Sequence, residues 1–238
     1  MSDHVTPSTP RSELTETFQT VPAPVGSNAY GKNERYMVSG FSGAVVGQAA
    51  FVADGVQLST FSGVAGNTGF SGANIVLLPH SVAGQSIVGF SGYSDTAKEL
   101  KFVCNFKTGT SVATEIIWCG LQPFNSTPVV ATNDDQIFYR YEAGVNNGCW
   151  QVIISRAGVD TTYSTSVAVT ASTWYSLEFC LDAGRYVFAS INDQVVAPSP
   201  MAPVTASVNM IPVLGVQDQF GTPRNVVVSK MYVGRSLS

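Results

Sequence analysis

Charged side chains are scarce in this sequence of 238 residues. Lysine, arginine, aspartate and glutamate make up only 12% of it, whereas hydrophobic residues make up 45%. Twelve basic residues against sixteen acidic ones give a formal net charge of −4 and leave no basic stripe, so binding to the phosphates of a nucleic acid is not expected. The scarcity of charge favours instead a surface that neighbouring subunits cover.

Long apolar runs are absent as well. No run reaches the roughly eighteen apolar residues that predict a membrane-spanning helix. The first ten residues lack the basic and apolar segments of a secretory signal. We therefore expect no membrane contact, and we expect synthesis in a cytoplasm.

Motifs for catalysis and metal binding are also missing. The sequence has two histidines, His4 and His80, and it has no nucleophile elbow, zinc-protease motif or Walker loop. Asn133-Asp134-Asp135 offers oxygen ligands without forming a recognisable calcium loop. The cysteines are widely spaced, which predicts reduced buried thiols, with a disulfide formed in an oxidising medium as the alternative; they are Cys104, Cys119, Cys149 and Cys180. We expect neither a metal nor a cofactor.

Paired carboxylates of the kind used by glycoside hydrolases are absent from the sequence as well. Glu178 and Asp182 lie on one predicted strand, four residues apart. At the rise of a strand this separates them by about 13 Å, too far for two groups that must flank one glycosidic bond. We therefore predict a solvated Glu178 and a protein that is not an enzyme.

Alternating strands are what the sequence does contain. Apolar residues from Tyr175 to Leu181 alternate with Ser176, Glu178 and Cys180, which is the period of a strand with one buried face. The chain then predicts a turn at 182–184, a strand at 185–191 and a second turn at 192–193.

Each of those turns has a residue suited to it. Gly184 is expected to take a positive φ, and Asn192-Asp193 tolerates the left-handed conformation. Residues 185–191 are apolar at both phases, which is typical of a strand inside a sandwich. Further strands follow from residue 99 at a spacing of about ten residues; they are Leu100–Phe106, Glu115–Leu121, Gln136–Glu142 and Cys149–Ser155. No segment shows a capped helical period, so the prediction is an all-β fold of two packed antiparallel sheets.

The order of these signals resembles a known family. Trp174-Tyr175 opens a strand, an aromatic strand follows a short turn, and Asn192-Asp193 stands where the family often has Asn-Gly. A last apolar strand, Asn225–Val233, completes the pattern. Residues 100–235 thus resemble the concanavalin-A-like (laminin-G-like) jelly roll, which implies a two-sheet jelly-roll sandwich and says little about function.

The first 34 residues differ from the rest. They are rich in proline, serine, threonine and glutamate, so 1–34 is predicted to be an extended arm, with one or two helical turns at most at 12–18. The sandwich domain is assigned to 35–238. Within the arm, the residues expected to contact a capsid or another subunit are Leu14, Phe18, Val21, Pro22 and Pro24.

A repeated tripeptide, Phe-Ser-Gly, marks residues 35–98 and separates them from the jelly-roll core at 99–238. Residues 40–63 and 69–92 align with equal length, which predicts a duplicated hairpin with turns at Asp54-Gly55 and Ala83-Gly84. Chance in a stretch rich in glycine and serine is the alternative. We expect the four phenylalanines to lie at a subunit contact; they are Phe41, Phe61, Phe70 and Phe90.

Two functions follow from these features. Similar jelly rolls occur among accessory proteins of tailed-phage virions, so the resemblance implies a virion structural protein. We expect a cement or decoration protein on the capsid surface, a homotrimer that binds the major capsid protein by many weak contacts. The alternative is a lectin-like, glycan-binding module of a tail fibre or surface protein. For it, Tyr139, Tyr141 and Trp150 are the candidate contacts, although core packing explains them too, and Trp174 is assigned a structural role.

Overall fold

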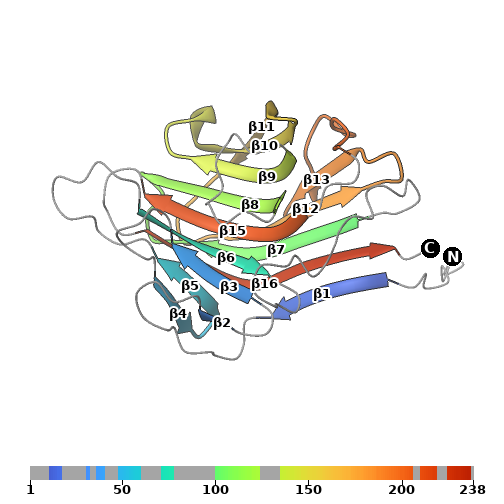
Figure 1. Cartoon of the computed structure of the whole chain (residues 1–238). Coiled ribbons are helices and arrows are strands. Elements are labelled where there is room, and N and C mark those ends of the chain that lie inside the picture. The colour runs from blue at the N-terminus through green and yellow to red at the C-terminus, as the bar shows by residue number, and fades with distance from the viewer. Residues whose placement is uncertain are drawn as a thin grey trace, which may run out of the picture.

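The computed structural model is a β-sandwich of two antiparallel sheets (Figure 1), as the sequence predicts. It describes residues 11–17, 31–32, 36–40, 48–59, 71–77, 100–123, 135–205, 210–218 and 224–236. In this part of the chain the one helical element is a single 3-10 turn, η2 (Asn146–Gly148). No helix in these ranges is long and apolar enough to cross a membrane.

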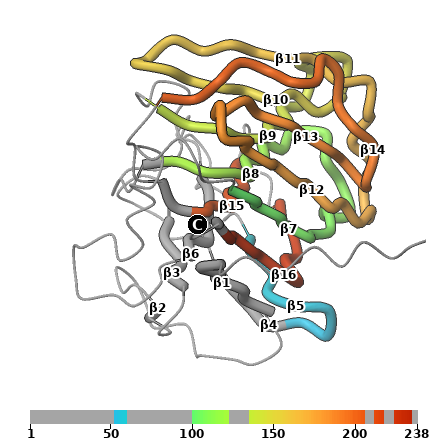
Figure 2. The backbone as a smooth tube through the Cα atoms, turned by 90° about the vertical axis from the view of Figure 1, so that its right-hand side faces the viewer, coloured from blue at the N-terminus to red at the C-terminus, as the bar shows by residue number. Residues whose placement is uncertain are grey.

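Sheet A and sheet B each contain eight strands. In spatial order, sheet A consists of β14 (Gln194–Val195), β13 (Val187–Ile191), β12 (Trp174–Leu181), β7 (Leu100–Thr108), β16 (Asn225–Ser236), β5 (Gly55–Ser59) and β4 (Gln48–Val52), with β1 (Arg11–Thr17) also paired to β16. Sheet B consists of β11 (Val159–Ala168), β10 (Cys149–Arg156), β9 (Asp135–Glu142), β8 (Glu115–Pro123), β15 (Met210–Asp218), β6 (Ser71–Leu77), β3 (Tyr36–Gly40) and β2 (Gly31–Lys32). Figure 2 shows the two layers turned by 90°.

The main core lies between the sheets and follows the predicted alternation. In β12 the side chains of Tyr175, Leu177, Phe179 and Leu181 are buried, and the residues between them point outward. Strand β7 repeats this pattern, with Leu100, Phe102, Cys104 and Phe106 buried. Side chains of the two sheets meet across the gap and exclude water, which supplies most of the stabilisation of such a fold.

Sheet B is apolar on its outer face as well. A second buried cluster lies there, formed by Ile116, Trp118, Phe138, Ile153 and Val213. Strands β8, β9 and β10 therefore bury both of their faces, and their sequences read as nearly continuous apolar runs.

The turn after β13 has the predicted conformation, whereas the turn before β13 differs from its prediction. Asn192 and Asp193 have φ values of 50° and 63°, as a two-residue hairpin turn of type I′ requires. At the preceding turn, Arg185 takes the left-handed conformation with φ 65°, so the expectation for Gly184 is wrong. The expectation that residues 185–191 are buried on both faces is also wrong. Phe188 and Tyr186 are 36% and 44% exposed, because the outer face of sheet A is open here.

The N-terminal region contains a strand where a helical turn was considered. Residues 11–17 form β1, which pairs with Lys230–Ser236 of β16 in the same chain. Strand β5 occupies the same side of β16 over Asn225–Val228, so β1 continues the row where β5 ends. The hairpin of β4 and β5 is present as predicted, but its turn is at Ala53-Asp54, one residue before the predicted Asp54-Gly55, because Gly55 already pairs with Val52. The corresponding turn at Ala83-Gly84 lies outside the described residues.

Candidate functional site

The three aromatic residues predicted for the glycan alternative lie in the core. Tyr139 and Trp150 are fully buried and Tyr141 is 4% exposed. The ring of Tyr139 stacks on Phe179 of the opposite sheet with centroids 4.4 Å apart, and Trp150 packs edge-on against Tyr141 at 6.0 Å. None of these rings presents a face to solvent. The prediction that they contact a glycan is therefore wrong, and the alternative explanation, core packing, is the correct one.

The predicted contact residues of the arm and of the repeat are mostly outside the described part. Leu14 is in β1, opposite Val233 of the same chain. The other predicted contacts fall outside the described residues; they are Phe18, Val21, Pro22, Pro24, Phe41, Phe61, Phe70 and Phe90.

A hollow of about 410 Å³ opens on the outer face of sheet A. Its walls come from three strands and two turns of that sheet. The lining residues are Asp54, Asn105, Trp174, Tyr175, Ser176, Asn192 and Ser229. We call this site the Trp174 hollow, because Trp174 is its large exposed aromatic side chain, at 41% exposure. Its volume is within the range of sites for small ligands.

Strand alternation explains why Trp174 points outward. It precedes Tyr175, the first inward residue of β12, so it shares the outer face with Ser176. Asn105 of β7 lies directly opposite Ser176 in the register of the two strands. Ser229 enters the hollow from β16 at a shift in register between Val228 and Lys230.

The polar groups of the hollow are held in place by the backbone. The Ser176 amide donates to Asn192 Oδ1 at 2.8 Å, and the Asn192 amide donates to the Ser176 carbonyl at 2.8 Å. These two bonds fix the β13–β14 turn against β12. The Ser229 hydroxyl donates to the Asn105 carbonyl at 3.2 Å. Backbone hydrogen bonds thus hold Asn192 and Ser229 in the wall of the hollow.

Asn105 supplies an acceptor that the described residues leave unused. Its Oδ1 atom is buried and has no hydrogen-bond partner among the described residues. Buried polar atoms in proteins are almost always hydrogen-bonded, so an exception beside a hollow calls for an explanation. The exposed carboxylate of Asp54 offers an acceptor to a ligand that carries hydroxyl donors, whereas Asn105 Oδ1 lies buried beneath the floor of the hollow.

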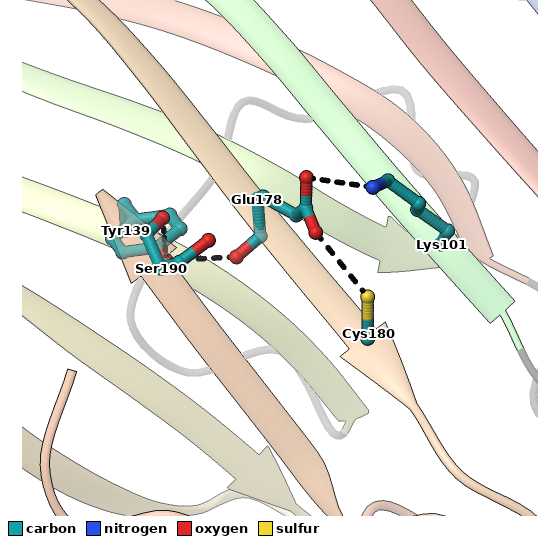
Figure 3. A network of polar contacts seen from close by, with 5 residues as sticks. All are labelled: Lys101, Tyr139, Glu178, Cys180 and Ser190. Carbon is teal, nitrogen blue, oxygen red and sulfur yellow. Dashed lines mark hydrogen bonds and ion pairs between the residues drawn. The ribbon is translucent and has the colours of Figure 1, made fainter. Parts of the chain in front are cut away.

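A polar network lies on the same face, beyond the hollow (Figure 3). Lys101 Nζ is 2.8 Å from Glu178 Oε2, and the Cys180 thiol donates to Glu178 Oε1 at 3.5 Å. The hydrogen bond that Lys101 makes with Glu178 raises the pKa of Lys101. Glu178 is thus paired, and the side chain of Asp182 accepts the Tyr186 amide at 2.8 Å. Neither carboxylate is arranged for the two-carboxylate chemistry of glycosidases.

Beneath this network a tyrosine hydroxyl joins the sheets. The Tyr139 hydroxyl of β9 donates toward the carbonyls of Glu178 and Ser190, at 2.9 and 2.7 Å (Figure 3). Glu178 and Ser190 are directly opposed in β12 and β13. Burial raises the pKa of Tyr139 well above its ordinary value of 10.0. This tyrosine therefore anchors the sheet that carries the hollow and takes no part in contacts at the surface.

Trp174 is the functional candidate that sequence reasoning missed. From the sequence alone it is assigned a structural role, like the core packing that explains the other aromatic candidates. The signal that identifies it was present: Trp174 is out of phase with the inward residues from Tyr175 to Leu181. A tryptophan at an outward position of a one-face-buried strand has its ring available to a partner or a ligand.

Comparison with known proteins agrees with this fold. Residues 84–197, just under half of the chain, match the family model described as SO2946-like, C-terminal domain. The crystal structure of a protein of unknown function, SO2946 from Shewanella oneidensis MR-1, is similar with a TM-score of 0.60 and 12% identity, over 96% of this chain and 87% of that one. No curated protein sequence matches this chain at a significant level.

Two further solved structures are relevant. The carbohydrate recognition domain of Emp46p in its potassium-bound form has a TM-score of 0.54 and 6% identity, over 83% of this chain and 87% of that one. A conserved carbohydrate esterase from Shiga toxin-encoding bacteriophage phi24B has a TM-score of 0.50 and 20% identity, over 84% and 89%. At these identities the likeness concerns the fold alone. The chain is therefore a concanavalin-like jelly-roll sandwich, as its strand pattern predicts.

Proposed function

We propose that this protein is a non-enzymatic glycan-binding module whose ligand stacks on Trp174. The observation that carries the proposal is a 41% exposed tryptophan in a hollow whose other lining residues are one tyrosine, two asparagines, two serines and one aspartate. Aromatic faces with a few convergent polar groups are the usual composition of small-ligand sites. The likeness to the Emp46p carbohydrate recognition domain is consistent with this function.

The ligand chemistry follows from the acceptors in the wall. The exposed Asp54 carboxylate accepts hydrogen bonds, so it favours sugar hydroxyls. The unpaired Asn105 oxygen costs stability, since a buried polar atom loses its bonds to water. We therefore expect Asn105→Ala to leave the free energy of unfolding unchanged or raised, and Asp54→Ala to lower glycan affinity.

The test is a glycan array with the full chain, followed by titration calorimetry of the strongest oligosaccharide. Trp174→Ala should weaken binding by about tenfold or more, which corresponds to about 1.4 kcal/mol. Tyr186→Ala is the matched control, because Tyr186 is equally exposed on sheet A but does not line the hollow. A chain that binds no glycan, or a Trp174→Ala variant with full affinity, would refute the proposal.

Capsid decoration stays a prediction from the sequence, together with its partner, the major capsid protein, its trimeric state and its location on a virion. No described residue favours it specifically. Residues 11–17 of the expected arm pair with β16 of their own chain, which leaves that segment without a free edge toward β16. Co-sedimentation of the protein with assembled capsids tests this second function.

A further inference from the structure

Sheet B ends in a strand with an open hydrogen-bonding edge. Within the described part of the chain, β11 pairs only with β10, and it is the outermost strand of its sheet in both views (Figures 1 and 2). The register is regular from Val159 to Ser164 and then shifts before Ala168. Residues 159–164 therefore form a regular edge, in which every second residue has its backbone N–H and C=O directed away from the sheet.

This edge lacks the usual protection against pairing. Proteins shield edge strands by making them short or by placing lysine or proline in them. The other outermost strands in the described part are shorter than the ten residues of β11, with two residues in β14, two in β2, five in β4 and seven in β1. Residues 159–164 contain no lysine, arginine or proline and carry one charge, on Asp160. Val159, at the start of this edge, is an apolar side chain that is 69% exposed.

The segment around Ala202 lies beside β11 but does not cover this edge. The amide of Ala202 donates to the hydroxyl of Tyr163 at 2.9 Å, on the side of β11 that faces the core. No described hydrogen bond joins this segment to the backbone of residues 159–164. Four successive residues of this edge are exposed to solvent: Val159, Asp160, Thr161 and Thr162.

We infer that residues 159–164 pair antiparallel with the same residues of a second copy of this chain, across a two-fold axis perpendicular to sheet B. Such an interface is isologous, so each copy uses the same surface. Directly opposed residues must point to the same face of the joined sheet, which requires a register centred on a residue. With Thr161 at the axis, Val159 lies opposite Tyr163 and Asp160 lies opposite Thr162.

This register satisfies the side chains as well as the backbone. It covers the exposed Val159 with an aromatic residue, twice by symmetry, and such cross-strand pairs stabilise a sheet. It places no like charges opposite each other. Because the two edges consume one another, assembly stops at a dimer and does not continue into a fibre.

The dimer has a consequence that depends on the proposed function. Rotation about an axis perpendicular to sheet B does not turn either copy over. The outer faces of sheet A in the two copies, with their Trp174 hollows, therefore lie on the same side of the dimer. Two sites on one side can bind a surface of repeated glycans with higher avidity than one.

The first test is sedimentation velocity of the full chain over about 1–100 µM, the range in which weak dimers dissociate. The unmodified protein should be a dimer at the upper end. Thr161→Lys places two lysines opposite each other at the axis and should raise the dissociation constant by about tenfold or more. Gln194→Lys adds the same charge to the exposed edge of sheet A and should leave the dimer intact. Equal urea midpoints would show that both variants fold.

The second test maps the register. Thr161→Cys should give a covalent dimer under mild oxidation, because cross-strand partners bring their Cα atoms within disulfide range. Gln194→Cys should not. A monomer at all concentrations, a trimer, or a dimer that Thr161→Lys does not weaken would overturn the inference. Since glycan binding is measured separately on Trp174, either proposal can fail without the other.

Discussion

Replacing Tyr139 by phenylalanine removes the hydroxyl that joins the two sheets and leaves the ring stack on Phe179 in place. The hydroxyl lies 2.9 and 2.7 Å from two backbone carbonyls in a fully buried setting. One buried hydrogen bond contributes about 1 kcal/mol, and a carbonyl that loses its donor costs more. We therefore expect Tyr139→Phe to lower the free energy of unfolding by about 1–2 kcal/mol. In urea this corresponds to a midpoint lower by about 0.5–1 M.

The pH dependence sharpens this prediction. The pKa of Tyr139 is raised well above 10.0 in the folded protein, whereas the unfolded chain has the ordinary value. Above pH 10 the unfolded state releases this proton and the folded state keeps it, so the stability supplied by Tyr139 is complete below pH 10 and falls as the pH rises. The loss is about 1.4 kcal/mol per pH unit. The difference between the unmodified protein and Tyr139→Phe should therefore vanish within about one to one and a half units above pH 10.

Tyr141→Phe is the matched control for the loss of stability at neutral pH. The hydroxyl of Tyr141 donates to one carbonyl, that of Val112, at 2.8 Å near the rim of the core. We expect a loss of about 0.5–1 kcal/mol. Urea unfolding followed by tryptophan fluorescence between pH 7 and pH 11 measures all three proteins. Equal losses for the two variants, or a constant difference for Tyr139→Phe across this range, would refute the reasoning.

Three further predictions concern other parts of the fold. Gly55→Ala should lower the free energy of unfolding by about 2 kcal/mol or more, because Gly55 has a φ of 143° and an added Cβ would clash with the Val228 carbonyl; a thermal melt measures this. In the native protein a thiol reagent followed by mass spectrometry should label the two half-exposed cysteines and spare Cys104 and Cys119, whose thiols are fully buried, and burial raises the pKa of Cys119. Asp193→Gly should stabilise the hairpin by about 0.5 kcal/mol in urea unfolding, because glycine adopts the positive φ of 63° without strain.

The sequence was most informative where a strand buries one face. In β12, polar residues at every second position identify the inward side, so the core residues from Tyr175 to Leu181 were predictable. In β9 and β10 both faces are buried, and the apolar pattern has no phase that distinguishes them. Tyr139 and Trp150 were therefore open to two interpretations, and only the packing of sheet A against sheet B decides between them.

Other features depend on partners distant in the chain. The short alternation of 11–17 cannot specify a strand by itself, because its partner is the second half of β16. The Trp174 hollow also joins residues from 54 to 229, a combination that no local motif encodes. The outward phase of Trp174 was the one part of the site that the sequence contained.

The order of strands in space has a consequence for how the chain reaches this fold. Strand β16 lies between β7 and β5 in the middle of sheet A, and β15 lies between β8 and β6 in the middle of sheet B. Both strands are made last, so during synthesis each sheet first lacks its middle strand. Sheet B cannot be completed until β15 leaves the ribosome, and sheet A cannot be completed until β16 does. Such non-local pairing slows folding and exposes apolar edges in the meantime. A nascent chain stalled before residue 210 should thus require chaperones, although most of its core residues have already been made.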